Sequence, residues 1–168
     1  MMFSRQVFRA VFLVTCTLTL FSSSAFSYGP NYPVGPNPIL TPGKLCDRPD
    51  NFRYAERIAY CSRDVTFESK EILIQKYDQQ LGFHIQSMDR ADFKIDHFIP
   101  LCAGGSNDSQ NLWPQHKSIY GVTDPLEPLL CEKMAQGRLG QSDAVKLIIR
   151  AKTDLSQVQL VLKTLRGL

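Results

Sequence analysis

Two neighbouring side chains, Asp96 and His97, form the most reactive pair in the sequence. An imidazole with an ordinary pKa of about 6.5 can take a proton from water near neutral pH. A carboxylate is the ligand that a hard divalent cation such as Mg²⁺ prefers. The pair therefore predicts that His97 activates water beside a metal ion held by Asp96. Because adjacent residues of a strand point to opposite sides, both can serve one reacting centre only where the strand twists or ends.

The surrounding residues predict such a strand end. Apolar and polar positions alternate from Phe93 to Ile99, and Pro100 closes the pattern. Residues 103–108 form a loop by composition, whose two glycines allow a tight turn. Asn111–Pro114 is predicted to be a second short strand, also closed by proline, with Trp113 in the core.

The stretch Asp96–Asp108, together with Asn111–His116, resembles the motif of HNH endonucleases. The shared features are an Asp-His pair at a strand end, a Gly-rich Ser-Asn-Asp loop and an Asn that opens the next strand. The resemblance is close over about residues 92–135. A longer pattern, which includes the Tyr60-Cys61 region, is similar to an exported bacterial subgroup of this family. It implies a ββα-metal finger, in which two strands and a helix surround one divalent ion.

The resemblance also implies an activity. The chain would be an endonuclease that hydrolyses phosphodiester bonds in DNA, leaving a 5′-phosphate and a 3′-hydroxyl, and RNA is left open as a substrate. His97 would be the general base, and Asp96 and Asn111 would complete the catalytic group. A nucleic-acid-binding module that kept the finger but lost cleavage is the alternative.

The second metal ligand does not follow directly from the motif. The family places one on the helix, where this chain has Tyr120 and Gly121. His116 is the nearest suitable side chain and is assigned as a metal ligand beside Asp96, with Asn111 as the alternative. The expected ion is Mg²⁺, and Mn²⁺, Ca²⁺ and Zn²⁺ are alternatives.

Charge gives little support for nucleic acid. Without Arg5 and Arg9 of the predicted leader, the 19 basic side chains become 17, against 16 acidic ones. Phosphate contacts would have to come from local clusters, and Lys117 and Arg150 are the candidates. These two belong to a set of basic residues that is more simply interpreted as solvated helix faces: Lys117, Arg138, Lys146, Arg150 and Lys152.

Residues 1–27 are typical of a secretory signal peptide, with early arginines, an apolar run over 10–21 and small residues before the cleavage site. The apolar run is shorter than the roughly 20 residues of a membrane span. The sequence therefore predicts a periplasmic or secreted protein with no membrane association after cleavage. Residues 28–45 are predicted to be an extended arm rich in Pro and Gly. Residues 46–168 would form a single, monomeric nuclease domain, and the sequence leaves open whether an inhibitor protein binds it.

Four cysteines remain after the leader, Cys46, Cys61, Cys102 and Cys131. An even number in an exported chain favours disulfides, and three pairings are open. Cys46–Cys61 with Cys102–Cys131 is favoured because each pair ties neighbouring segments. A four-cysteine zinc site is the alternative, although no C-x-x-C spacing is present.

Helix signals lie on both sides of the finger. Thr66 is a predicted N-cap for a helix over 67–81 that Gly82 ends, and a shorter helix is expected over 54–60. Asp124 is expected to begin a helix with a Glu127 capping box.

Ser142 and Asp154 are expected to begin two more helices. The predicted fold class is therefore α+β, with a ββα-metal (HNH) finger embedded among helices and stabilised by disulfides.

Overall fold

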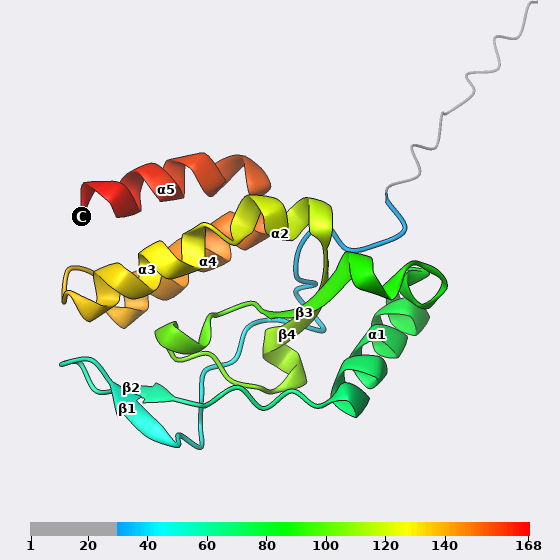
Figure 1. The fold of residues 1–168 in the computed structure, drawn as a ribbon, viewed down its shortest axis with the longest axis horizontal. Helices are drawn as coiled ribbons and strands as arrows, with labels where there is room; N and C mark the ends of the chain where they lie inside the picture. Colours follow the sequence, from blue (N-terminus) through cyan, green and yellow to red (C-terminus); the bar gives the residue numbers. More distant parts are fainter. Residues whose placement is uncertain (1–29) are drawn as a thin grey trace, which may run out of the picture.

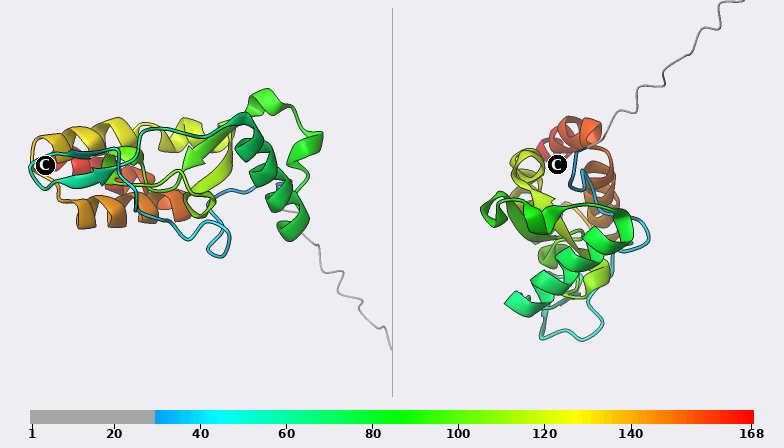
Figure 2. Two further views of the ribbon diagram at one scale, coloured as in Figure 1. Left: turned by 90° about the horizontal axis from the view of Figure 1, so that it is seen from below. Right: turned by 90° about the vertical axis from the view of Figure 1, so that its right-hand side faces the viewer.

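The computed structural model describes residues 30–168, so the predicted signal peptide and the start of the arm lie outside the described residues. The hairpin of β3 (Phe93–His97) and β4 (Leu112–His116) lies between α1 (Phe67–Leu81) at one end and a layer of three helices at the other (Figures 1 and 2). The three helices are α3 (Leu126–Ala135), α4 (Gln141–Thr153) and α5 (Val158–Gly167). The fold is α+β, with two small antiparallel sheets. The elements are β1 Asn51–Arg53, β2 Ile58–Tyr60, α1 Phe67–Leu81, β3 Phe93–His97, β4 Leu112–His116, α2 Lys117–Thr123, α3 Leu126–Ala135, α4 Gln141–Thr153 and α5 Val158–Gly167.

Helix α1 begins and ends where its local signals predict. The Thr66 side chain accepts a hydrogen bond from the Ser69 backbone N–H, which satisfies one of the free amides of the first turn. Gly82 ends the helix in the left-handed conformation, at φ 71°. Leu73, Ile74 and Tyr77 form its buried side, against the hairpin.

The hairpin of β3 and β4 is antiparallel, and its register pairs Phe93 with His116 at one end and His97 with Leu112 at the other. Strand β3 ends at His97, two residues earlier than the alternation predicts. Strand β4 continues through Pro114, which was expected to close it. A two-stranded sheet leaves one edge of each strand unpaired, so a residue without an N–H is tolerated there.

The prediction of a short helix over residues 54–60 is wrong. Asn51–Arg53 and Ile58–Tyr60 pair instead as the antiparallel hairpin β1–β2. Tyr54 and Arg57 in its turn have φ values of 60° and 56°, which a helix excludes. The Arg57 N–H donates to the Tyr54 carbonyl and closes the turn.

The region around Asp124 also differs from the prediction. Helix α2 directly follows β4 and ends at Thr123, so Asp124 follows a helix instead of opening one. Helix α3 begins at Leu126 without a side-chain cap. Glu127 forms no capping box, because its carboxylate accepts a hydrogen bond from Lys152.

The two C-terminal helices are confirmed with small shifts of their starts. Helix α4 begins at Gln141, one residue before Ser142. Asp154 caps a short 3₁₀ turn that leads into α5, because its carboxylate accepts from the Ser156 N–H. The buried sides of α3, α4 and α5 share one apolar core.

The cysteines pair as favoured, Cys46 with Cys61 and Cys102 with Cys131. This pairing excludes the four-cysteine zinc site and indicates an oxidising compartment. Among the helices of residues 30–168, none combines the length and the apolar character needed to cross a membrane.

The described part of the arm, residues 30–45, is irregular but packs on the domain. Leu40 and Thr41 are buried, and the Thr41 hydroxyl donates to the Leu112 carbonyl while bonding the Tyr77 hydroxyl. The Tyr32 ring stacks on His116, with centroids 4.0 Å apart. The arm therefore holds α1 and β4 together.

Candidate active site

Asn111 closes the loop that follows β3. Its Oδ1 accepts from the Ile99 N–H at 2.9 Å, and its Nδ2 donates to the carbonyls of Ile99 at 2.9 Å and Ser106 at 3.0 Å. A Cβ on Gly105 would lie 1.8 Å from the Ile99 oxygen, so only glycine permits this approach. The fully buried amide of Asn111 uses its acceptor and both N–H groups in this clamp.

The clamped loop positions the His97 ring through Asn107. The Asn107 Nδ2 donates to the Ser62 carbonyl at 2.6 Å, so its Oδ1 faces the His97 Nε2, 3.0 Å away. The other ring nitrogen, Nδ1, lies 3.1 Å from a guanidinium nitrogen of Arg63. A guanidinium can only donate, so Nδ1 is the acceptor and the ring proton is on Nε2. His97 therefore presents a basic Nδ1 to Arg63.

The environment of His97 keeps the ring neutral. The side chain is buried, at 4% exposure, and burial lowers its pKa below the ordinary 6.5. The hydrogen bond to Asn107 acts in the opposite direction, and the Arg63 charge again lowers the pKa. At neutral pH the ring can accept a proton.

Asp96 faces a different partner from its neighbour. One carboxylate oxygen lies 2.7 Å from the Lys152 ammonium and the other 3.3 Å from the Lys94 ammonium. Burial alone would raise the pKa of Asp96, but the two lysines outweigh burial and hold the pKa below its usual value. The carboxylate is ionised and paired with cations on both oxygens.

Lys152 joins β3 to the helical layer. Its ammonium donates to Asp96, to the Glu127 carboxylate at 2.6 Å and to the His97 carbonyl at 2.6 Å. Burial alone would lower the pKa of Lys152, but the two carboxylates raise it above the ordinary 10.5. The pKa of Glu127 is raised by burial, and the positive charge of Lys152 acts in the opposite direction. Lys152 was expected on a solvated helix face, and the structure instead buries it at 1% exposure.

An open pocket of about 510 Å³ lies along the outer edge of β3, the edge that faces away from β4. In the described chain no other strand pairs with this edge. We call this pocket the β3-edge pocket. Asp96 and Glu127 line it, whereas the His97 ring does not. Arg63 links the two, because it lines the pocket while it bonds His97 and, at 3.0 Å, the Ile95 carbonyl. The cationic residues in the lining are Arg63, Lys70, Arg90 and Lys94.

His116 lies at the opposite end of the hairpin. It pairs with Phe93, three residues along the strand from Asp96, which corresponds to about 10 Å at the usual rise of a strand. Its Nδ1 accepts from the Ser118 N–H and caps α2. Its Nε2 is 3.8 Å from Asp92. The structure does not bring His116 together with Asp96.

The two candidate phosphate contacts also lie outside the pocket lining. Lys117 is exposed and pairs with Asp92 at 2.7 Å. Arg150 is exposed and donates to the Gln157 side chain. Both belong to solvated helix faces.

The residues assigned to a divalent ion do not fit one as they lie. Both oxygens of Asp96 face ammonium groups, the Asn111 amide is used by the loop clamp, and His116 is at the far end of the hairpin. Over residues 30–168, no group of three or more His, Cys, Asp and Glu side chains gathers in a way that could hold a metal.

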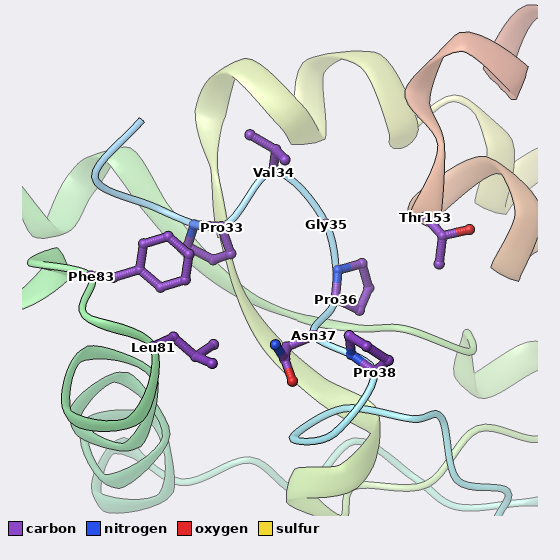
Figure 3. Close-up of a pocket in the computed structure, with 9 residues that line it drawn as sticks. All are labelled: Pro33, Val34, Gly35, Pro36, Asn37, Pro38, Leu81, Phe83 and Thr153. Carbon is purple, nitrogen blue, oxygen red and sulfur yellow. The ribbon is translucent and has the colours of Figure 1, made fainter. Parts of the chain in front are cut away.

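A second hollow, of about 420 Å³, lies between the arm and the end of α1 (Figure 3). Pro33, Pro36 and Pro38 line it on one side and Leu81 and Phe83 on another. No side chain in its lining is ionisable, so it offers no acid, base or charge for catalysis.

The sequence patterns missed Arg63, Asn107 and Glu127 as neighbours of the pair. Asn107 belongs to the recognised loop, but Arg63 precedes a helix and has no motif around it. Lys152 had a usable signal. It follows Ala144, Ile148 and Ala151 on the buried side of α4, and a lysine within an apolar stripe needs a buried partner.

Comparisons with protein-family models, with curated proteins and with solved structures give no match to this chain. The geometry around His97 and the motif in the sequence therefore carry the functional argument.

Proposed function

We propose that this chain binds the phosphodiester backbone of nucleic acid in the β3-edge pocket and hydrolyses it, as an HNH-type endonuclease with His97 as the general base. The observation that carries the proposal is the His97 ring itself. Asn107 holds its Nε2–H, and its basic Nδ1 faces an arginine of a cationic pocket. A fixed tautomer beside a phosphate-binding group is what such a base requires.

The pocket supports binding of a phosphate chain. Arginine forms paired hydrogen bonds with phosphate oxygens, and Arg63 and Arg90 lie in the same lining. Lys70 and Lys94 add charge that neutralises phosphate as counterions leave. DNA is expected ahead of RNA on the motif alone.

The reaction would start when phosphate draws the Arg63 guanidinium away from His97. Nδ1 then takes a proton from water, and the oxygen of that water bonds to phosphorus. The bond from phosphorus to the O3′ oxygen breaks, and O3′ takes a proton from solvent. Arg63 and Lys94 would stabilise the negative charge that builds on the phosphate oxygens.

No step is assigned to a divalent metal, because the oxygens of Asp96 already pair with Lys152 and Lys94. A divalent ion, when bound at such a site, lowers the pKa of water and neutralises phosphate. In this chain the neutralising charges come from side chains of the β3-edge pocket.

A second candidate function is binding without cleavage. It is favoured by the burial of His97 at 4% exposure and by the ammonium held between Asp96 and Glu127. This version keeps the cationic pocket and lacks turnover.

A cleavage assay separates the two candidates. The oxidised protein is incubated with supercoiled plasmid and with single-stranded RNA, each with Mg²⁺ and with EDTA. We expect nicked products from the wild type and their loss in His97→Ala. His84→Ala is the matched control, because His84 is exposed and outside the pocket lining. Equal cleavage by His97→Ala would remove His97 from its role.

A binding assay tests the pocket without cleavage. Fluorescence anisotropy with a labelled oligonucleotide at several salt concentrations should show weaker binding by Arg63→Ala and Arg90→Ala. Each should lower the salt slope by about one. Arg150→Ala should match the wild type, because Arg150 lies outside the pocket lining. Binding without cleavage products would favour the second candidate function. If the protein neither bound nor cleaved nucleic acid, both candidate functions would be refuted.

A further inference from the structure

The ammonium of Lys152 lies in a cage of three oxygens. These are the Asp96 Oδ2 at 2.7 Å, the Glu127 Oε1 at 2.6 Å and the His97 carbonyl at 2.6 Å. The oxygens come from β3 and α3, while the lysine comes from α4. An ammonium has three N–H donors, so every donor of Lys152 is used.

The cage has the composition of a site for a hard cation. Two carboxylates and a backbone carbonyl are the oxygen donors that bind Mg²⁺, Mn²⁺ or Ca²⁺ in proteins. Here the donors converge on a positive charge that belongs to the chain. No other cation can use the same oxygens while the ammonium stays among them.

The charges around the cage show why a cation must be present. Asp96 and Glu127 bring two negative charges to the Lys152 ammonium. The Lys152 side chain is almost completely shielded from solvent. Lys94 contacts the other oxygen of Asp96, at 3.3 Å, and it also pairs with Asp124 at 2.5 Å. Without Lys152 the two carboxylates would repel each other, with one cation left to compensate both.

We infer that Lys152 is the resident cation of this site and takes the place that the Asp96–Glu127–His97 oxygens would otherwise give to a divalent metal ion. The wild type then binds no divalent ion at Asp96, and removal of the ammonium opens a metal site. The inference concerns only the cation that these oxygens hold, so it does not depend on whether the chain cleaves nucleic acid. Any cleavage by the wild type would continue in EDTA.

The test measures Mn²⁺ binding by isothermal titration calorimetry and by the electron paramagnetic resonance signal of free Mn²⁺. We expect no saturable binding by the wild type. Lys152→Ala and Lys152→Gln should each bind one Mn²⁺, with a Kd of about 10⁻⁴ M, as in weak oxygen-ligand sites. Lys146→Ala is the matched control on the same helix, because Lys146 is exposed and pairs with Asp143, and it should behave as the wild type.

A second substitution locates the ion. Adding Asp96→Asn to Lys152→Gln should abolish the gained binding. If Lys152→Ala is unfolded alone, Mn²⁺ should restore its circular dichroism and raise its Tm. Stoichiometric Mn²⁺ binding by the wild type that Asp96→Asn removes would overturn the inference. So would folded Lys152 variants that bind no Mn²⁺, or variants that stay unfolded with and without it.

Discussion

The two buried histidines of the β3–β4 hairpin make an informative comparison. His97 ends β3 and His116 ends β4, at opposite ends of the same two-stranded sheet, and their exposures are 4% and 8%. Residue type, burial and position in a strand are therefore similar. The partners of their Nδ1 atoms differ.

The Nδ1 of His116 accepts a backbone N–H of α2, that of Ser118, and the ring is fixed by stacking on Tyr32. The Nδ1 of His97 accepts from the side chain of Arg63, which also lines the β3-edge pocket. A backbone amide cannot leave without unwinding the helix, whereas a guanidinium can move to a phosphate. A histidine can therefore act as a base only where its acceptor nitrogen faces a partner that can be exchanged.

Replacing each histidine by alanine should separate the two most strongly. His97→Ala should lower kcat by about 10²- to 10⁴-fold, the usual contribution of a general base. His116→Ala should leave kcat close to that of the wild type, because His116 and the two partners of its ring, Ser118 and Tyr32, lie outside the pocket lining. The measurement is the initial rate of plasmid nicking below the Tm of both variants. A large loss of kcat in a folded His116→Ala variant would show that the two histidines do not differ in this way.

Removing one disulfide at a time should show which segment holds the His97 ring in place. The loops closed by Cys46–Cys61 and Cys102–Cys131 span sequence separations of 15 and 29, which predicts losses of about 3 and 3.5 kcal/mol. Only the serine double variant of Cys46 and Cys61 should also reduce cleavage by the folded protein. Cys61 precedes Ser62 and Arg63, which anchor Asn107 and bond His97.

Urea unfolding gives the loss of stability in each double variant, and cleavage is assayed well below both transitions. The Cys102 and Cys131 variant is the control. Its bridge ties the start of the loop after β3 to α3, and the Asn111 amide holds that loop without the bridge. If both folded variants retained full cleavage, the segment after Cys61 would not be needed to hold the His97 ring.

The cap formed by His116 predicts a smaller effect on stability. His116→Ala should lower the free energy of unfolding by about 1 kcal/mol, the typical value of a lost N-cap. His116→Asn should recover part of it, because asparagine also accepts from the amides of a first turn. Urea denaturation measures both variants. No loss in His116→Ala would show that the ring contributes nothing as a cap.

The smallest expected effect is a displacement of the pH profile. Burial lowers the pKa of His97, and a base must be neutral to act. Log kcat/KM should therefore rise with pH at a midpoint below the ordinary 6.5 and be level at pH 7. Arg63→Gln removes a positive charge from Nδ1 and should move the midpoint upward. A wild-type midpoint above 6.5 would contradict the environment described for the ring.

Features with local causes could be predicted from the sequence. Thr66, the spacing of apolar residues and Gly82 define α1 within one stretch of chain, and the structure agrees. The pairings Cys46–Cys61 and Cys102–Cys131 were favoured by proximity and are confirmed. The function of the Asp96–His97 pair remains a prediction.

Features that depend on distant partners could not be predicted in this way. Arg63 and His97 are 34 residues apart, and Lys152 and Asp96 are 56 apart. Periodicity shows that a residue faces inward but does not identify the group it meets. The β1–β2 hairpin was missed for a local reason, since Tyr54 and Arg57 adopt positive φ without being glycine.

The Asn111 clamp has a consequence for dynamics. The buried side chain of Asn111 bonds the N–H and the carbonyl of Ile99 and the carbonyl of Ser106. Because Asn111 directly precedes β4, the loop between β3 and β4 can open only when the start of β4 moves with it. The amide hydrogen of Ile99 should therefore exchange with deuterated solvent as slowly as those of the strands. The segment carrying Asn107 would behave as part of the sheet, not as a surface loop.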